Sequence, residues 1–408
     1  MTRVEVLMES APAILYLTAQ QAEAMVKAGK RLASDTAWWG DGDNLVERQV
    51  IRCTRHGSDT WDVRVVDAVG LIAVGDLQLE VLPKIPLAHL LYLFGHSGRF
   101  PRLADEAVGS AVGQSLWELA ARWFLIEMER LLRKDLLRGY EAETDWLRVV
   151  RGRADTVATS RSLASGRLEA LCTFEDFTID TPWNRVLLEA TRRVSQSALL
   201  PWSERKRALG VRQRLEGVGA LQPQDLRVPL ERRAHYYRSA VRLAIHIIQG
   251  HARTIEHGSH EAWTFLIRTP PMVEDGLRNV LRDHLGGRWG TAKSSKQLRG
   301  STMTVNPDIV VDGGLAIADV KYKLAQSEWR RADLYQAIAF AVAFESRDAA
   351  LIGFDGSSKV WKPDVQIGDI RVRDLSWNAD PDMDPKDSGH LIASQMGRWL
   401  TDIETSKH

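Results

Sequence analysis

The order of apolar and polar positions changes character along the chain and predicts three regions. In the first, residues 1–110, short runs alternate at the period of a β-strand. Turn residues at 56–59, at Gly70 and at Gly75 and Asp76 separate these runs. A helix is predicted over 18–33, with Thr18 as its cap. The predicted strands are VEVLM, VERQVIRCT, WDVRVVD, LIAVG and LQLEVLP. The pattern predicts a β-rich N-terminal module.

The second region, residues 111–255, has the period of helices. One apolar stripe in VGQSLWELAARWFLIEMERLLRKDLL comprises Leu116, Ala120, Phe124, Met128, Leu131 and Leu132. Further helices are predicted at 184–199, 203–215 and 232–249. Basic residues are frequent here, which is typical of solvated helix faces and also compatible with a nucleic-acid groove. They include Arg148, Arg151, Arg153, Arg192, Arg193, Arg205, Lys206 and Arg207.

The third region, residues 256–408, holds the least ordinary pattern, VNPDIVVDGGLAIADVKYK. Two apolar strands joined by a turn each carry an acid, Asp308 in one and Asp319 in the other. A surface loop, NADPDMDPKDSG, precedes a final helix predicted over 391–403. Together the three regions predict a multidomain α+β protein.

Composition and charge narrow the class of protein. The 408 residues are 44% hydrophobic and 26% charged, as in ordinary globular domains. Lys and Arg number 54 against 53 Asp and Glu, so any nucleic-acid contact should be local. Cys53 and Cys172 form no CxxC or Cys/His cluster, which argues against a zinc site and fits a reducing cytoplasm. Glu5 and Glu9 interrupt the N-terminal apolar residues, so a signal peptide is not expected. A membrane span is not expected either, because no apolar run approaches the length of one.

The register of the hairpin brings its acids together. A turn at Gly313 and Gly314 would place Asp308 directly opposite Asp319, whereas a turn at Asp312 and Gly313 would make them a diagonal pair. In both registers the two carboxylates and Lys321 share one face. Like charges this close repel in a half-buried site, and a divalent cation would compensate them. Carboxylate oxygens suit Mg²⁺. An acid at a turn needs no such explanation, and this accounts for Asp312.

Two helices can add to this site. In PPMVEDGLRNVLRDHL, Glu274 lies at the start of the stripe formed by Leu277, Leu281 and Leu285, so either the helix dipole or a metal explains it. After the hairpin, RRADLYQAIAFAVAF predicts a helix with a stripe of Leu334, Ile338 and either Ala341 or Val342. Tyr335 and Gln336 lie in its first turn, where they either are core polar residues or orient a phosphate or water.

Pro307, Asp308 and the Asp-x-Lys of Asp319, Val320 and Lys321 resemble the PD-(D/E)XK nuclease signature. More specifically, the chain resembles the McrC family, the nuclease subunit of McrBC-type restriction systems. The segments that carry this resemblance are VGLIAVGDLQLEVLPKI, RGRAD, FEDFTIDTPWNRVL, YYRSAVRLA and NPDIVV…IADVKYK…DLYQAIAFA. The segment MVEDGLRNVL matches loosely, because it lacks a Phe before the glutamate.

The resemblance implies a C-terminal α/β restriction-endonuclease-like core that hydrolyses DNA with Mg²⁺, for which Mn²⁺ is an expected substitute. Asp308, Asp319, the Val320 carbonyl and Glu274 are the implied metal ligands. Lys321 would stabilise developing charge, and Gln336 would orient the phosphate or the lysine, while Tyr335 is expected to pack. Lys293, Lys296 and Arg299 in KSSKQLRG, with Lys323, are candidate contacts to the DNA backbone, or a solvated loop.

The resemblance also implies a partner, a ring-forming AAA+ GTPase of the McrB type that recognises modified cytosine and translocates double-stranded DNA. The β-rich module would dock into that ring and stimulate hydrolysis. The chain has no P-loop of its own, since Gly29 and Lys30 lack the upstream glycine and the following Ser or Thr. Trp38, Trp39 and the turn at 55–59 are candidate partner contacts. A stand-alone repair or recombination nuclease and a non-catalytic GTPase-activating adaptor are the alternatives.

Overall fold

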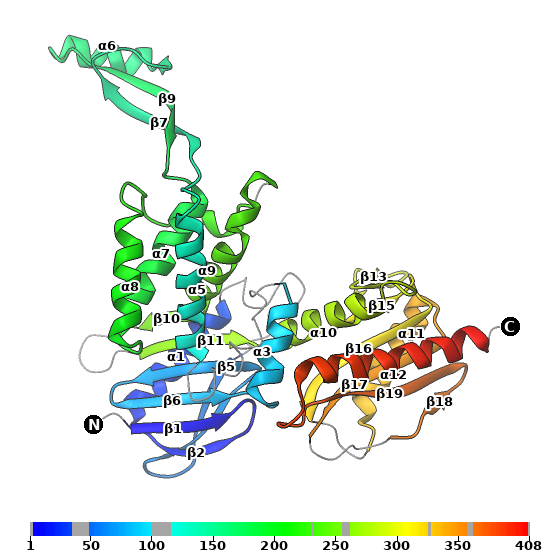
Figure 1. The fold of residues 1–408 in the computed structure, drawn as a ribbon. Coiled ribbons are helices and arrows are strands. Elements are labelled where there is room, and N and C mark those ends of the chain that lie inside the picture. Colours follow the sequence, from blue (N-terminus) through cyan, green and yellow to red (C-terminus); the bar gives the residue numbers. More distant parts are fainter. Residues whose placement is uncertain are drawn as a thin grey trace. The chain divides into compact units, whose positions relative to one another are not determined.

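The computed structural model describes residues 3–34, 49–98, 116–229, 232–254, 262–324, 328–356 and 362–406. Trp38, Trp39 and the predicted region boundaries near 110 and 256 lie outside these ranges. The described chain is a mixed α/β protein that divides into two compact units (Figure 1). One unit joins residues 1–116 with 250–408, and the other comprises 117–249. The predicted middle region corresponds to the second unit, whereas the first and third regions share one unit. Within the described ranges, no helix is long and apolar enough to cross a membrane.

The N-terminal strands form two small sheets around one core. A five-stranded sheet has the order β1-β6-β5-β11-β10, and a three-stranded sheet has the order β2-β4-β3. Leu7, Ile51, Ile72 and Leu79 are among the buried residues of their shared core. The elements are β1 (Arg3–Met8), β2 (Ala13–Tyr16), α1 (Ala19–Ser34), β3 (Ile51–Arg55), β4 (Thr60–Val65), β5 (Ala68–Val74), β6 (Leu77–Leu82), α3 (Leu87–His96), β10 (His251–Thr254) and β11 (Ala262–Arg268).

Two details of this module bear on the sequence predictions. Thr18 caps α1 as predicted: its Oγ1 accepts from the Gln21 N–H, and the Gln21 side chain accepts from the Thr18 N–H in return. The prediction of a break at Gly70 is wrong, because β5 runs through it and pairs it with Leu266 of β11. Gly70 has φ +141°, and a Cβ there would lie 2.0 Å from the Phe265 carbonyl oxygen. The glycine therefore permits a close strand pair.

The remaining part of the first unit is a six-stranded sheet with the order β12-β15-β16-β17-β19-β18. Strands β16, β17 and β19 run parallel, and the flanking pairs are antiparallel. Helix α11 packs against Ala349, Leu351 and Val372 of this sheet. Its elements are α10 (Pro270–Leu285), β12 (Thr291–Ala292), β13 (Lys296–Gln297), β14 (Thr304–Val305), β15 (Ile309–Val311), β16 (Ala316–Leu324), α11 (Arg331–Phe344), β17 (Asp348–Asp355), β18 (Val365–Ile367), β19 (Ile370–Asn378) and α12 (Pro385–Thr405).

The second unit is less helical than predicted. Its helices are α5 (Leu116–Leu132), which begins at the last residue of the first unit, α7 (Pro182–Gln196), α8 (Trp202–Gln213) and α9 (Arg238–Gly250), with 3₁₀ turns η1 (Asp225–Arg227) and η2 (Arg232–Tyr237). A three-stranded sheet, order β7-β9-β8, is inserted between α5 and α7. It comprises β7 (Gly139–Leu147), β8 (Arg153–Ala154) and β9 (Ala170–Thr178), with helix α6 (Thr156–Ala164). We call residues 139–178 the arm, since they project from the unit's helices (Figure 1).

Candidate active site

The acid-bearing hairpin forms, with the register of the first alternative. Ile309 pairs with Ala318 and Val311 with Ala316, so one further step places Asp308 opposite Asp319. The turn is wider than two residues, because Asp312, Gly313 and Gly314 all have positive φ. The N–H groups of Gly314 and Leu315 both donate to the Val311 carbonyl. Asp312 thus lies in the turn, as the sequence indicates, and its side chain accepts from the Gly290 N–H at 2.8 Å, just before β12.

Asp308, Asp319 and Lys321 are brought together by this hairpin. Asp308 and Asp319 are only 7% and 5% exposed. The Asp308 Oδ2 accepts a hydrogen bond of 2.8 Å from the Val320 N–H. The Lys321 ammonium forms an ion pair with Asp319 Oδ2, although this buried oxygen accepts no well-directed hydrogen bond. The same ammonium donates to Gln336 Oε1 of α11 at 2.6 Å. This contact is compatible with the expectation that Gln336 orients the lysine.

The electrostatics of the site disfavour a full set of negative charges. Burial raises the pKa of Asp308 well above its ordinary value of 3.8, and the Glu274 and Asp319 carboxylates raise it further. The Val320 N–H lowers the pKa of Asp308, but by less. The pKa of Glu274 is raised by burial, against the lowering effect of Lys293. The site therefore favours either a shared proton or a bound cation.

Glu274 lies beside this pair from α10. Its side chain is about one-fifth exposed, and it forms a 3.9 Å ion pair with Lys293. The neighbouring Arg278 donates to the Asp308 backbone carbonyl at 2.9 Å, which ties α10 to the start of β15. No local pattern indicates this role for Arg278, because the contact joins residues that are thirty positions apart. Leu277, Leu281 and Leu285 are buried as predicted.

The donor atoms at this site are those that Mg²⁺ prefers, carboxylate oxygens with a backbone carbonyl nearby. Within the described ranges, no group of three or more His, Cys, Asp or Glu side chains is gathered as closely as a metal site requires. The Lys321 ammonium instead compensates the charge of Asp319. The crowded and buried acids fit a cation chemically, because a cation would offset the repulsion between their carboxylates.

Helix α11 presents its first turn to the strand that carries Lys321. Asp333 accepts from Lys323 at 2.8 Å, a pairing that the sequence analysis missed. Ala341 is fully buried and Val342 is 61% exposed, which decides between the two predicted stripes. The expectation that Tyr335 packs is wrong, because its side chain is 64% exposed. Tyr335 and Gln336 are adjacent on α11. Only the face of this helix that meets β16 and β17 is buried.

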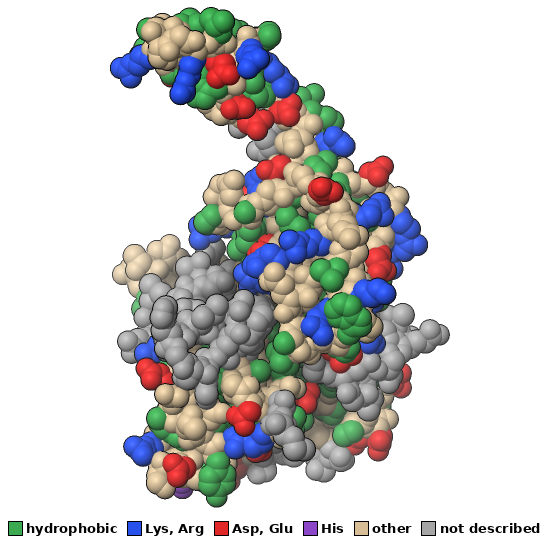
Figure 2. Space-filling view, turned by 90° about the vertical axis from the view of Figure 1, so that its left-hand side faces the viewer, with side chains coloured by type: hydrophobic (Ala, Val, Ile, Leu, Met, Phe, Trp, Pro, Cys, Tyr) green, Lys and Arg blue, Asp and Glu red, His purple; other side chains and the backbone are tan. Residues whose placement is uncertain are grey.

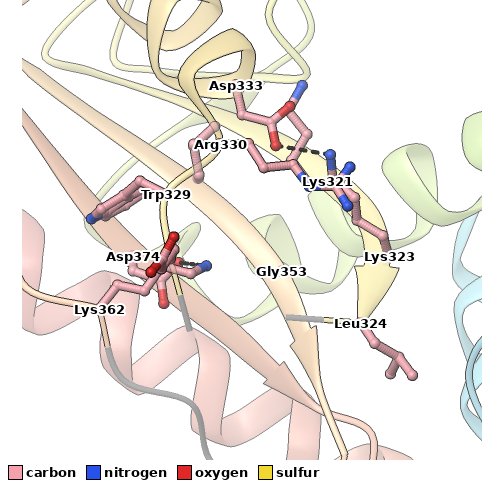
Figure 3. A pocket seen from close by; sticks show the side chains of 11 residues that line it. Lys321, Lys323, Leu324, Trp329, Arg330, Asp333, Gly353, Lys362 and Asp374 are labelled. Carbon is pink, nitrogen blue, oxygen red and sulfur yellow. Dashed lines mark hydrogen bonds and ion pairs between the residues drawn. The ribbon is translucent and has the colours of Figure 1, made fainter. Parts of the chain in front are cut away.

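A small cavity of about 40 Å³ opens beside Lys321 and Lys323 (Figure 3). Arg330 and Trp329 line it before α11, and Leu351 and Gly353 line it from β17. Lys362 also lines it, ion-paired to Asp374 at 3.1 Å. The cavity therefore joins Lys321 to further cationic and aromatic side chains.

The basic segment is partly neutralised by acids. Lys293 pairs with Glu274, and Lys296 lies 3.2 Å from a carboxylate oxygen of Glu345. Arg299 is exposed in the loop between β13 and β14. In the second unit, Arg192 and Arg193 pair with Glu189 and Arg207 pairs with Glu204, all within one turn of a helix. These pairs favour the solvated-face interpretation there.

Among the described residues, exposed large apolar side chains are most numerous on two segments. On the arm, Leu168 is 81% exposed and Val149 is 78% exposed, and Figure 2 shows hydrophobic and basic side chains side by side over this segment. The arm's other exposed apolar residues are Tyr140, Trp146, Val150, Val157, Leu163 and Phe177. In the N-terminal module, the edge strands β1 and β2 expose Val4, Val6, Met8, Ile14 and Tyr16. Exposed apolar groups of this extent mark interaction surfaces.

A solved structure shares the fold of this chain, and a family model matches its sequence. A chain of the structure described as Thermococcus gammatolerans McrB AAA+ hexamers with bound McrC matches with a TM-score of 0.62 and 14% identity, over 97% of this chain and 100% of that one. A chain of the Thermococcus gammatolerans McrBC complex matches with a TM-score of 0.45 and 15% identity, over 69% and 88%. No curated protein matches in sequence. The model of the family described as McrBC 5-methylcytosine restriction system component matches residues 63–352, so the chain belongs to that family.

Proposed function

We propose that this chain is the Mg²⁺-dependent DNA endonuclease subunit of its restriction system, with a PD-(D/E)XK core formed by α10, the six-stranded sheet and α11. The observation that carries the proposal is the convergence of Asp308, Asp319 and Lys321 on one buried hairpin, with Gln336 on the lysine. A structural hairpin has no need of two opposed buried acids. A phosphodiesterase needs both a cation site and a cationic group beside it.

Asp308, Asp319, the Val320 carbonyl and Glu274 would hold the ion. When bound, Mg²⁺ polarises the scissile phosphate and lowers the pKa of a bound water. The Val320 N–H fixes one Asp308 oxygen and leaves the other for the ion. Lys321 leaves its pairing with Asp319, holds a phosphate oxygen and positions the attacking water, while Gln336 keeps the ammonium in reach.

Contacts to double-stranded DNA would flank this centre. Arg299 is one proposed phosphate contact. Lys293, Lys296 and Lys323 are the others, released from their carboxylate partners when DNA binds. These contacts carry no base preference, because they address the backbone alone. Recognition of the modified base would belong to a partner.

That partner would be a hexameric AAA+ GTPase, since the similar solved structure contains McrB AAA+ hexamers with McrC. The N-terminal module is the proposed docking element, and its exposed edge strands support this. The turn at 55–59 is a weaker candidate, because Arg55 folds back onto the carbonyls of Gly57 and Ser58. The exposed apolar surface of the arm is a second docking candidate that the sequence analysis missed.

Plasmid cleavage tests the proposal. Methylated and unmethylated plasmids are incubated with Mg²⁺ and GTP, with and without the AAA+ protein encoded beside this chain. We expect cleavage that requires methylation, GTP and the partner. Cleavage by this chain alone would favour the stand-alone nuclease, and the absence of an adjacent AAA+ gene would favour it too. Faster GTP hydrolysis without any cleavage would favour the adaptor.

A further inference from the structure

Strand β16 is irregular where it carries the catalytic lysine. Val320 pairs with Ile352 of β17, but Leu324 pairs with Phe354, so four positions on β16 span two positions on β17. Residues 321–323 therefore form a bulge. Bulges re-aim side chains and leave backbone groups without ladder partners, which suits a lysine that must face Asp319. Something outside the sheet has to hold the released backbone.

Lys84 of the N-terminal module holds this bulge. Its ammonium lies 3.4 Å from the Tyr322 backbone oxygen and 4.9 Å from the centre of the Tyr322 ring. The Tyr322 ring is buried and packs edge-on against Phe354, on the face opposite Lys321. The amino group of Lys84 thus contacts both the backbone and the side chain of the residue between Lys321 and Lys323.

Lys84 is itself anchored by acids of the N-terminal module. It lies 3.2 Å from Asp67, in the turn between β4 and β5, and 3.8 Å from Glu9, just after β1. Glu9 is buried and accepts a hydrogen bond from Thr269, the residue before α10. Lys84 is the cation to which both of these acids pair. Burying the Glu9 carboxylate is costly, and the Lys84 ammonium compensates its charge.

We propose that Lys84 is a positioning residue for the nuclease reaction, which sets the bulge that aims Lys321 and so couples the N-terminal module to the cleavage site. This rests on the proposed nuclease function. A small displacement of a group that stabilises the transition state is costly, because its contribution depends on its position relative to the reacting atoms. A partner that moves the turns holding Glu9 and Asp67 would act on Lys321 through Lys84.

The test uses the full-length chain with its AAA+ partner. Lys84→Met combined with Glu9→Gln removes the ammonium without leaving Glu9 charged and unpaired. We expect kcat for DNA cleavage to fall about 10- to 100-fold, with KM for DNA and the stimulation of GTP hydrolysis unchanged. Lys84→Arg, which can still reach the Tyr322 carbonyl, should recover most of the loss. Hydrogen exchange of the peptide over residues 316–324 should be faster in the double variant.

A control variant separates positioning from general loosening. Asn279→Ala removes a 2.8 Å hydrogen bond from α10 to the His96 carbonyl of α3, another tie between the N-terminal module and the C-terminal elements, and one that does not touch β16. This variant should retain kcat and the exchange rate of residues 316–324.

The proposal is overturned if the double variant keeps kcat within about twofold while folded. It is overturned equally if Asn279→Ala gives the same loss, or if GTPase stimulation falls in parallel, since Lys84 would then act on stability or docking. If the wild-type chain cuts no DNA, the nuclease proposal fails by itself. The exchange measurement then still decides whether Lys84 holds the strand.

Discussion

Two antiparallel strand pairs of this protein break the usual rule of burial in opposite directions. The β15–β16 hairpin buries two acids among apolar side chains, whereas the arm's β7–β9 pair exposes large apolar side chains to solvent. Each is costly for a folded chain, the first through desolvation and the second through exposed apolar area. A buried charged group therefore indicates a reactive site, whereas an exposed apolar group indicates a surface that binds a partner.

The largest expected effect is the loss of DNA cleavage on substitution of the hairpin's charged residues. Asp308→Ala and Lys321→Ala should each lower cleavage by about 10²-fold or more, because one removes an implied metal ligand and the other the cation at the phosphate. Stimulation of the partner's GTP hydrolysis should be retained. Asp312→Asn, in the same hairpin but at its turn, should cleave normally. Cleavage rates on methylated plasmid check this, and survival of cleavage in both variants would mean that the site is misassigned.

The next largest expected effect is weaker partner binding when the apolar surface of the arm is changed. Val149→Ser with Leu168→Ser should weaken binding to the AAA+ partner by about 10- to 100-fold if the arm docks, because central apolar contacts dominate interfaces. Val4→Ser with Val6→Ser makes the same change on β1 and tests the N-terminal module. Leu209→Ser, on α8 of the second unit, is a matched exposed control. Interferometry measures the affinity of each variant for the AAA+ partner. If the affinity falls in neither double variant, both proposed docking surfaces are contradicted.

A smaller effect concerns stability without metal. Between 3.8 and its raised pKa, Asp308 binds more protons in the folded chain than in the unfolded one, so its contribution to stability falls as pH rises through that window. Asp308→Asn removes this loss of stability. In the presence of a metal chelator, the thermal unfolding midpoint of the variant should exceed that of the wild type at about pH 8. The two midpoints should approach each other at about pH 5. Added Mg²⁺ should stabilise the wild type more than the variant, and equal shifts would contradict a metal role for Asp308.

The smallest expected effect is that of Gln336, which orients the lysine without replacing it. Gln336→Ala should reduce kcat by about tenfold, the lower end of the worth of one hydrogen bond to a charged group, and leave KM for DNA unchanged. Tyr335→Ala, next to it on the exposed side of α11, serves as the control for local damage. A loss as large as that of Lys321→Ala would give Gln336 a direct role in the reaction.

Local patterns predicted the parts of the fold that depend on neighbours in sequence. The cap at Thr18, the register of the hairpin and the buried stripe of α10 all follow from residue types within a few positions of one another. The β-strands of the arm were missed, because helices with strong periodicity flank them and their own apolar residues face solvent. Gly70 was misread as a break because only its partner strand β11 makes a glycine necessary inside β5.

The sequence by itself determined that two acids and a lysine share one strand-pair face, since the alternation of side chains and a two-glycine turn leave few registers. Only the tertiary structure decided what surrounds them: Glu274 and Arg278 from α10, Gln336 from α11 and Lys84 from the N-terminal module. Periodicity shows which side of an element is buried but not which distant element buries it. Contacts between residues hundreds of positions apart, such as Lys84 with Tyr322, follow from the packing of whole elements.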